Sequence, residues 1–313
     1  MSCIVANSLS KSYGPTIAVD GIDLSVNSGK IFGFLGPNGA GKTTTIKLLT
    51  TLIAPTRGTI NILGTDATQH PLEVRKKIGV VLQQPSYEPT LSVEKSLEKY
   101  GMMWNVESKT RKDRVEELLS SFNLEEIRNI KNEDLSIGQR RRVQVAREFM
   151  HDMKLLFLDE PTVGLDPSAR RGLLDFIKKK VKEGLTVFFT THILNEAEYI
   201  CDEIAIINKG KIIAIDTPEE LKNKFGKEKT IKIHIQETRK MLSNLLLGIK
   251  DYELDFNSGT NITIRSNYSE EVLLKILQIL TANNIPIEDL SVVPTSLEEI
   301  FLTVVKNSNA SSN

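Results

Sequence analysis

The sequence predicts an α/β protein with a second, smaller α+β domain at its carboxyl end. Two patterns support this prediction. Over residues 1–225, short apolar runs alternate with charged segments of helical period, which is typical of a largely parallel sheet covered by helices. From residue 230, apolar and polar residues alternate one by one, which is typical of strands with one buried face. The chain has 313 residues, enough for two domains of this kind.

The first domain contains apolar runs of buried-strand length. Residues 30–35, 155–158 and 186–190 are such runs, and a parallel sheet with both faces covered requires continuous burial of its central strands. Residues 107–122 and 166–183 are charged and have a helical period. We expect these two segments to be solvated helices that flank the sheet.

The second domain follows a charged, Gly-containing stretch at residues 224–228, which we interpret as a linker. The predicted elements are strand 230–236 with Ile231, Ile233 and Ile235 on one face, helix 238–247, strand 252–256, hairpin turn 257–260, strand 261–265, helix 269–283 with Val272, Ile276 and Leu280 on its apolar face, strand 287–293, and helix 296–305 capped by Ser296 and Glu299. This order is ferredoxin-like with one helix appended. We therefore place the domains at 1–225 and 226–306 and expect residues 307–313 to be a disordered tail.

The charge balance and the rare residue types exclude several classes of protein. Lys plus Arg and Asp plus Glu each total 40, and this zero net charge argues against nucleic acid as a partner. Two cysteines and four scattered histidines fit neither a disulfide scaffold nor a zinc finger. No apolar run is long enough to span a bilayer, and the first ten residues lack a signal sequence. We expect a cytosolic chain whose membrane span, if it works at a membrane, belongs to another polypeptide.

The strongest motif begins at Gly36, between a predicted strand and a helix that opens near Lys42. It fits the phosphate-loop pattern G-x4-G-K-[ST], in which glycines let backbone N–H groups surround the phosphates of a nucleotide. Lys42 is expected to reach the β- and γ-phosphates, and the Thr43 hydroxyl to bind Mg²⁺. The expected nucleotide-binding residues of this loop are Gly36, Pro37, Asn38, Gly39, Ala40, Gly41, Lys42, Thr43 and Thr44.

Two carboxylates, Asp159 and Glu160, end the apolar run at residues 155–158. At the carboxyl edge of a parallel sheet, Asp159 can hold Mg²⁺ and Glu160 can polarise an attacking water molecule. Many buried strands end in acidic residues, so this motif is weak alone and becomes strong beside the phosphate loop.

Residues 135–139 read Leu-Ser-Ile-Gly-Gln and open a helix twenty residues before Asp159. Here the sequence resembles the ATP-binding-cassette (ABC) superfamily, whose signature is Leu-Ser-Gly-Gly-Gln. Ile137 replaces the first glycine of that signature, whereas Ser136, Gly138 and Gln139 match it. The resemblance implies that these three matching residues bind the nucleotide of a second cassette.

Other positions resemble the remaining family motifs, in the family's order. Tyr13 resembles the aromatic residue that stacks on adenine, and Gln83 the glutamine that contacts Mg²⁺ and water, with Gln84 as a neighbouring alternative. Asp166 resembles part of the loop that crosses the cassette dimer, and His192 the switch histidine that senses the γ-phosphate. The resemblance thus implies catalytic roles for Glu160 and His192. Its implied metal ligands are Thr43, Gln83 and Asp159.

The resemblance covers residues 3–225 and implies a cassette fold, a mixed sheet flanked by helices with a helical subdomain. It further implies ATP and Mg²⁺ as cofactors, a homodimer or heterodimer of cassettes, and an ABC-type membrane permease on a separate chain that docks near residues 85–97. Such a protein is cytoplasmic and peripheral on the inner face of the cell membrane. The segment 294–303 is similar to the tail of daunorubicin-resistance-type cassettes, which serve exporters.

Several alternatives stay open at this point. The leading hypothesis is the ATPase subunit of a membrane exporter, and the alternative is a soluble ABC ATPase that acts on a ribosome or another macromolecule. The second domain is either an extra dimerisation surface or, less in keeping with its residues, a small-molecule sensor. The run Arg140, Arg141, Arg142 is interpreted as the solvated start of a helix, with contact to an acidic partner as its alternative.

Overall fold

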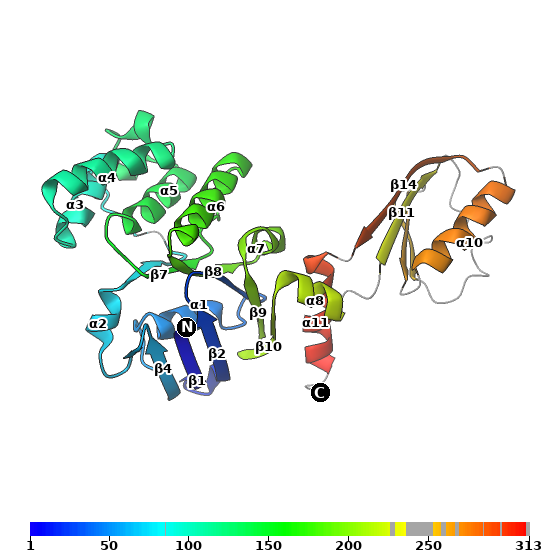
Figure 1. Cartoon of the computed structure of the whole chain (residues 1–313), viewed down its shortest axis with the longest axis horizontal. Coiled ribbons are helices and arrows are strands. Elements are labelled where there is room, and N and C mark those ends of the chain that lie inside the picture. The colour runs from blue at the N-terminus through cyan, green and yellow to red at the C-terminus, as the bar shows by residue number, and fades with distance from the viewer. Residues whose placement is uncertain are drawn as a thin grey trace. The chain divides into compact units, whose positions relative to one another are not determined.

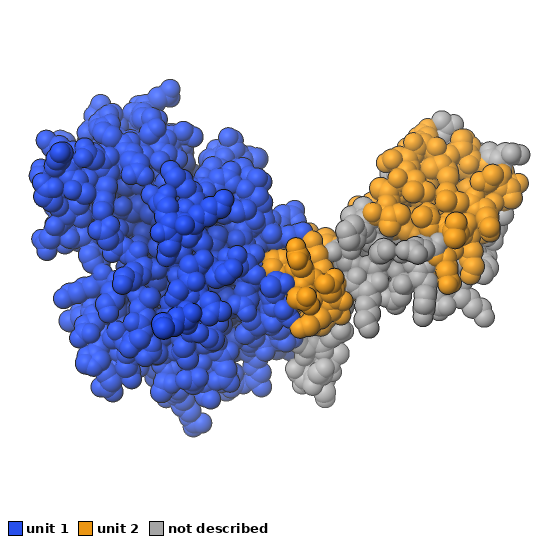
Figure 2. Space-filling view, viewed as in Figure 1, with its two compact units in different colours: residues 1–217 blue, residues 218–313 orange. Residues whose placement is uncertain are grey.

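The computed structural model describes residues 1–310 except 85, 226–228, 236–252, 258–260, 267–268, 284 and 295. The chain divides into two compact units, Met1–Thr217 and Pro218–Asn313 (Figure 2). The sequence predicts the boundary after residue 225 instead. The difference is helix α8 (Pro218–Phe225), which contacts helix α11 (Leu297–Ala310) of the second unit.

Two sheets form the first unit (Figure 1). The larger has six strands in the order β10-β9-β3-β8-β7-β6, and all its neighbouring strands are parallel except the β9–β10 pair. Its strands are β3 (Ile31–Leu35), β6 (Ile78–Val81), β7 (Leu155–Asp159), β8 (Thr186–Thr191), β9 (Glu203–Asn208) and β10 (Lys211–Asp216). The prediction of a largely parallel, helix-covered sheet is confirmed for this part of the unit.

The smaller sheet is antiparallel, with the strand order β2-β1-β4-β5. Its strands are β1 (Ser2–Tyr13), β2 (Thr16–Asn27), β4 (Arg57–Ile62) and β5 (Thr65–Asp66). None of these four strands is among the apolar runs from which the sequence predicts the buried strands of the first domain. Together the two sheets give the mixed parallel and antiparallel structure that the family resemblance implies.

Helices surround the sheets of the first unit, and three of them, α3, α4 and α5, lie together at one end of it (Figure 1). The helices are α1 (Lys42–Leu49), α2 (Pro71–Arg75), α3 (Val93–Met103), α4 (Ser108–Ser121), α5 (Ile137–Glu148), α6 (Pro167–Lys182) and α7 (Leu194–Ile200), with 3-10 turns η1 (Glu125–Ile127) and η2 (Asn132–Asp134). The α3–α5 group corresponds to the helical subdomain that the resemblance implies. None of the helices in the described ranges is long and apolar enough to cross a membrane.

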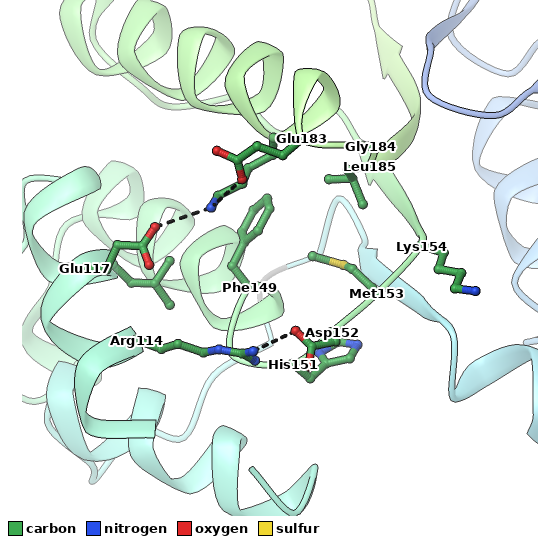
Figure 3. A pocket seen from close by; sticks show the side chains of 12 residues that line it. Arg114, Glu117, Phe149, His151, Asp152, Met153, Lys154, Glu183, Gly184 and Leu185 are labelled. Carbon is green, nitrogen blue, oxygen red and sulfur yellow. Dashed lines mark hydrogen bonds and ion pairs between the residues drawn. The ribbon is translucent and has the colours of Figure 1, made fainter. Parts of the chain in front are cut away.

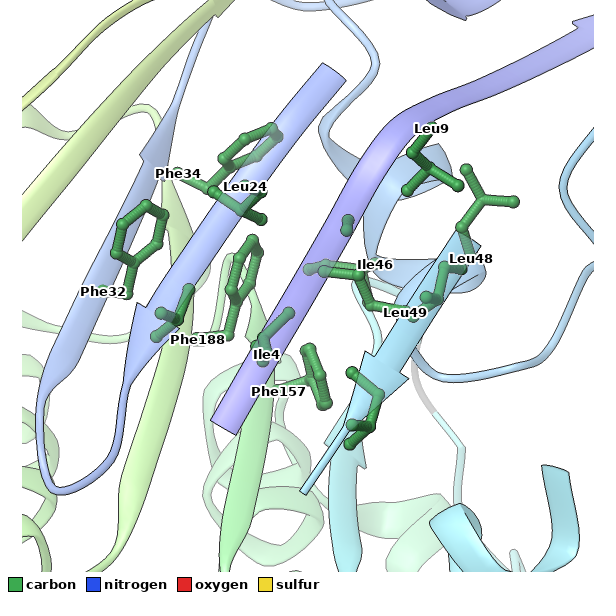
Figure 4. Packing of buried hydrophobic residues seen from close by; sticks show 14 of the residues in the cluster. Ile4, Leu9, Leu24, Phe32, Phe34, Ile46, Leu48, Leu49, Phe157 and Phe188 are labelled. Carbon is green, nitrogen blue, oxygen red and sulfur yellow. The ribbon is translucent and has the colours of Figure 1, made fainter. Parts of the chain in front are cut away.

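Helix α1 belongs to a hydrophobic core that both sheets share (Figure 4). Its Ile46 is fully buried in the same cluster as Ile4 of β1 and Phe188 of β8. The Phe188 ring lies 5.7 Å from that of Phe32 and 5.4 Å from that of Phe34. Burying each such side chain contributes on the order of 1.5–3 kcal/mol. The helix that follows the phosphate loop is therefore held on several sides.

The described strands of the second unit form an antiparallel sheet in the order β12-β13-β11-β14. The elements are β11 (Lys229–Ile235), β12 (Glu253–Asn257), β13 (Asn261–Ser266), α10 (Ser269–Ala282) and β14 (Ile287–Pro294). This is the strand order of a ferredoxin-like fold, and Ile231, Ile233, Val272, Ile276 and Leu280 are buried as their spacing predicts. The predicted helix 238–247 lies outside the described residues.

Helix α11 begins as the sequence predicts and ends later. The Ser296 N–H donates to the Glu299 carboxylate at 3.1 Å, and the Glu299 N–H donates to the Ser296 hydroxyl at 3.3 Å, which is a capping box. The helix continues to Ala310, so residues 307–310 are helical rather than disordered. A nucleated helix can continue past the predicted end at residue 305 because each further residue adds one hydrogen bond.

Candidate nucleotide-binding and catalytic site

The phosphate loop lies between β3 and α1, as predicted, and its backbone requires glycine. Gly41 has a φ of 111°, and a Cβ atom there would lie 2.5 Å from the Ala18 carbonyl oxygen. A Cβ atom on Gly36 would lie 2.4 Å from the Ile207 carbonyl oxygen. Gly41 is also the N-cap of α1, and it offers no side-chain cap to the N–H groups of the first turn. The loop therefore presents backbone donors at a helix N-terminus, which is an anion-binding arrangement.

Lys42 directs its ammonium group back into this loop. Its Nζ donates to the carbonyl oxygens of Gly36 at 2.8 Å and Pro37 at 3.3 Å, and lies 3.8 Å from Glu160 Oε1. Burial lowers the pKa of Lys42, while the negative charges of Glu160 and Asp159 raise it. A cation that donates to carbonyl oxygens at the loop can exchange these contacts for charge-assisted hydrogen bonds to phosphate oxygens.

Asp159 ends β7 next to the start of α1, although 116 residues separate it from Thr43. Its Oδ2 accepts a hydrogen bond of 2.8 Å from the Thr43 hydroxyl, and its Oδ1 accepts one of 2.6 Å from the Thr190 hydroxyl. The structure thus brings together two of the three predicted metal ligands. A hydroxyl and a carboxylate oxygen beside a phosphate loop suit Mg²⁺, which prefers oxygen ligands and is usually completed by substrate phosphates and water.

Glu160 is the residue on which the predicted catalytic groups converge. Its Oε2 accepts a 3.3 Å hydrogen bond from Gln83 Nε2 and lies 3.2 Å from His192 Nδ1. Its backbone has a φ of 50°, unusual for a residue with a side chain, and its N–H donates to Thr190 at 3.1 Å. Between Gln83 and Gln84, it is Gln83 that the structure brings to this carboxylate.

The signature residues lie away from the Glu160 cluster, at the N-terminus of α5 in the same unit. Ser136 is the N-cap: its hydroxyl accepts from the Gln139 N–H at 3.2 Å, and its own N–H donates to Gln139 Oε1 at 2.9 Å. A Cβ atom on Gly138 would lie 2.7 Å from the Gly164 carbonyl oxygen, so the helix start packs closely against the loop that precedes Asp166.

Tyr13 and Asp166 do not contact the Glu160 carboxylate in the described structure. Tyr13 ends β1, is 49% exposed, and has Lys11 Nζ 5.3 Å from its ring centroid. Asp166 is exposed and caps α6: its Oδ1 accepts from the Ala169 N–H at 2.9 Å, which lowers the pKa of Asp166. Neither residue forms a hydrogen bond or ion pair with the Glu160 carboxylate within the described chain.

Sequence reasoning missed Arg141. It belongs to the arginine run interpreted as a solvated helix start, but the structure buries it to 6% exposure. Its guanidinium donates to the carbonyl oxygens of Asp159 at 2.6 Å and Glu160 at 2.8 Å. The reason for the error is that these acceptors lie 18 and 19 residues away in the sequence and approach only in the fold.

A separate pocket lies at the ends of α4, α5 and α6 rather than at the phosphate loop (Figure 3). Several of its charged side chains pair with one another. Arg114 binds Asp152 at 2.6 Å, and Lys180 contacts Glu117 at 3.3 Å and Glu183 at 3.1 Å. These pairs satisfy the charges locally, so we assign this pocket no ligand.

The phosphate loop, the two carboxylates at the end of β7 and the sheet that joins them define a P-loop ATPase. A sequence profile described as ABC transporter matches residues 19–163, and one described as the C-terminal domain of DrrA1-3-like ATP-binding proteins matches residues 217–305. The chain belongs to the family of ABC transporter ATP-binding proteins.

Individual relatives agree with this membership. The chain is 34% identical over 305 residues to the linearmycin resistance ATP-binding protein LnrL of Bacillus subtilis, covering 96% of this chain and 97% of that protein. It is 35% identical to the daunorubicin/doxorubicin resistance ATP-binding protein DrrA of Streptomyces peucetius, covering 96% and 92%. A solved dimeric ATP-binding cassette in a post-hydrolysis state with ADP and Pi has a TM-score of 0.64 and 26% identity, covering 68% and 98%.

These similarities establish the general function. The chain is an ATP-binding subunit of an ABC transporter, and it is an ATPase. Cassettes of this family dimerise and work with membrane permease subunits. The family and the relatives named for drug resistance and multidrug transport support a transport ATPase rather than the alternative of a ribosome-acting protein.

Proposed function

We propose that Glu160 is the general base of ATP hydrolysis and that Lys42, Gln83 and His192 arrange the reaction around it. The observation that supports this is the convergence of all three side chains on the Glu160 carboxylate, at 3.2 to 3.8 Å. A carboxylate held there can accept a proton from the water that attacks the γ-phosphate. His192 then senses the γ-phosphate, and Lys42 binds the β- and γ-phosphates.

The proposed Mg²⁺ ligands are Thr43, Asp159 and Gln83. When bound, the ion supplies positive charge to the phosphate oxygens. Thr43 and Asp159 already lie within 2.8 Å of each other, so little rearrangement is needed for both to reach one ion. The phosphate loop, residues 36–44, and Tyr13 complete the proposed ATP site within one chain.

The second half of the ATP site, we propose, comes from another cassette. Ser136, Gly138 and Gln139 at the N-terminus of α5 contact the γ-phosphate of the ATP bound by the partner, with Asp166 at the interface. An arrangement in which each chain gives one phosphate loop and one signature is self-complementary and closes as a dimer. ATP then favours the closed dimer, and hydrolysis removes the contacts that hold it. A dimeric cassette among the structural neighbours supports this.

We further propose that the closing and opening of this dimer energises an exporter in the cell membrane. Relatives named for drug resistance, similar over nearly the whole chain, support export. The permease would be a separate chain that contacts the region of residues 85–97, and the cassette would lie on the cytoplasmic face of the membrane.

The substitution Glu160→Gln tests the proposed base. It keeps the shape of the side chain and removes its negative charge, so turnover should fall by about 1,000-fold, within the usual 10²–10⁴ range for a general base. ATP affinity, measured by calorimetry, should change by less than about threefold because Lys42 and the loop remain. Steady-state phosphate release measures turnover. Glu183→Gln, at an exposed pair with Lys180, is the matched control and should behave as the parent.

The same variant tests the dimer. Light scattering should find Glu160→Gln as a dimer with ATP and as a monomer with ADP, because ATP that is not hydrolysed keeps the closed state populated. Turnover equal to the parent's would refute the role of Glu160. A mass that does not depend on the nucleotide would refute the ATP-dependent dimer.

A further inference from the structure

Three consecutive arginines of α5 have different surroundings. Arg140 donates to the Leu135 carbonyl oxygen and to the Tyr87 hydroxyl, each at 2.9 Å. Arg142 donates at 2.9 Å to two carbonyl oxygens that follow α4. Only Arg141, of these three, is buried, and it points into the carboxylate loop. Arg141 is therefore buried between two neighbouring arginines that form their hydrogen bonds closer to the surface.

Arg141 makes five hydrogen bonds, four of them to backbone carbonyl oxygens. Its Nη2 donates to Asp159 at 2.6 Å and Glu160 at 2.8 Å, and its Nε donates to Pro161 at 3.2 Å. Its Nη1 donates to the Leu82 carbonyl oxygen at 2.6 Å and to Gln144 Oε1 at 2.8 Å. One rigid guanidinium therefore joins the loop that carries both carboxylates to the residue that precedes Gln83.

Gln144, one turn later on α5, extends this connection. Its Nε2 donates to the carbonyl oxygens of Leu82 at 3.4 Å and Gln84 at 3.3 Å, on either side of Gln83. The helix that begins with the signature is thus bonded to the backbone around all three groups of the proposed reaction centre. These groups are Asp159, Glu160 and Gln83.

The Glu160 backbone needs such support. Its φ of 50° lies in the left-handed region, where a residue with a Cβ atom is strained by about 1–3 kcal/mol and persists only if its surroundings fix it. Thr190 accepts the hydrogen bond of the Glu160 N–H on one side, and Arg141 donates to the Glu160 carbonyl oxygen on the other. Both ends of this residue are therefore held.

A buried guanidinium is costly unless its donors are bonded. Burial lowers the pKa of Arg141 to about 10, against the opposing effect of Asp159 and Glu160, so the group stays charged near neutral pH. The positive charge gives stronger hydrogen bonds to the carbonyl oxygens than a neutral donor would give. A neutral side chain of similar length could fill the space but could not hold four carbonyl groups together.

We propose that Arg141 is a positioning residue for ATP hydrolysis, one that fixes the backbones of Asp159 and Glu160 and the strand end before Gln83 to the signature helix. It acts through these residues and touches no phosphate in this assignment. Because Ser136 is the N-cap of α5, the same guanidinium links the proposed binding surface for a second cassette to the carboxylates that act on ATP. The inference rests on the proposed role of Glu160.

The test compares Arg141→Met and Arg141→Lys with Arg142→Met in the full-length chain. Methionine keeps the length and removes the donors, whereas lysine keeps the charge and loses the planar fork. Both Arg141 variants should lower kcat by about 100-fold, the usual effect of misplacing a reacting group by about 1 Å. ATP affinity by calorimetry should stay within about threefold of the parent's. Arg142→Met, which also removes bonds to two carbonyl oxygens, should keep kcat within about twofold.

Circular dichroism and thermal unfolding separate positioning from folding. Support requires that kcat, expressed per folded molecule, falls while ATP affinity is kept. A kcat per folded molecule within threefold of the parent's in both Arg141 variants would overturn the proposal, as would an equal loss in Arg142→Met. Failure of both Arg141 variants to fold would assign the residue to stability and overturn it as well. If Glu160→Gln itself kept normal turnover, the proposed function would fail instead, which distinguishes the two results.

Discussion

The first unit contains two helix N-termini that sequence patterns connect with phosphate, and they differ in how they are capped. Helix α1 begins at Gly41, which gives no side-chain cap, and Lys42 and Thr43 follow it directly. Helix α5 has Ser136 as its N-cap, and Ser136 and Gln139 form a reciprocal capping box. Ile137, the first helical residue of α5, is 70% exposed. The N-terminus of α1 has no side-chain cap and lies among residues of its own chain. The N-terminus of α5 is capped by side chains and is exposed.

This difference in capping indicates which phosphate contacts each chain can make. The open N-terminus of α1 has nearby partners of its own, a lysine and two carboxylates, so one chain can bind a nucleotide there. The capped N-terminus of α5 is stable without a ligand because Ser136 and Gln139 satisfy each other. The N–H groups of Ile137 and Gly138 have no acceptor within a helix, since the first turn lacks preceding carbonyl groups. In the proposed dimer, these two donors bind the phosphate of the ATP held by the partner cassette.

The largest effect expected from this comparison is that of Ser136→Arg. In the Glu160→Gln background, the added side chain should weaken ATP-dependent dimerisation by at least about 100-fold, because it fills the space that the partner's γ-phosphate would occupy. ATP affinity of each monomer should be unchanged, since α1 is untouched. Light scattering and calorimetry measure the two quantities.

Ser120→Arg, on the exposed side of α4, is the control for added charge and should still dimerise. A Ser136→Arg protein that forms the ATP dimer as readily as this control would contradict the division of work between α1 and α5.

Lys42→Ala should have the next largest effect, on the open helix. It removes a charge-assisted contact to phosphate, worth about 1.5–3 kcal/mol, so ATP affinity should fall by about 10- to 150-fold. Lys47→Ala, in the last turn of the same helix, is the matched control because it lies away from the loop. Equal affinities of the two variants in calorimetry would show that Lys42 is not the phosphate contact.

How far the sequence could predict this site depends on the range of each interaction. The phosphate loop and the Asp159–Glu160 pair are local patterns, and the structure has them between β3 and α1 and at the end of β7. Between Gln83 and Gln84, the spacing from Ile78 and Gly79 favours Gln83, and in the structure Gln83 Nε2 donates to Glu160 Oε2 at 3.3 Å. Arg141 was misinterpreted because nothing in a run of three arginines shows which one turns inward.

Two parts of the fold also could not be predicted from local patterns, because they depend on contacts between distant residues. The antiparallel sheet depends on pairs such as Ile4 with Ile62, which are far apart in the sequence. The boundary between the units lies after Thr217 rather than after residue 225, because α8 contacts α11 at the other end of the second unit's sequence. In both cases the deciding contacts are tertiary, and periodicity within one segment carries no information about them.

The smallest expected effect concerns the two capping boxes, and it separates stability from function. Ser136 with Gln139 and Ser296 with Glu299 have the same geometry, but only the first pair belongs to the signature. Replacing an N-cap serine by alanine costs about 1 kcal/mol, about fivefold in a folding equilibrium. Ser136→Ala and Ser296→Ala should therefore each destabilise their own unit by about that amount in urea unfolding. In the Glu160→Gln background, only Ser136→Ala should also weaken the ATP dimer. If Ser296→Ala weakened the dimer equally, lost stability would explain both results, and α5 would have no special role.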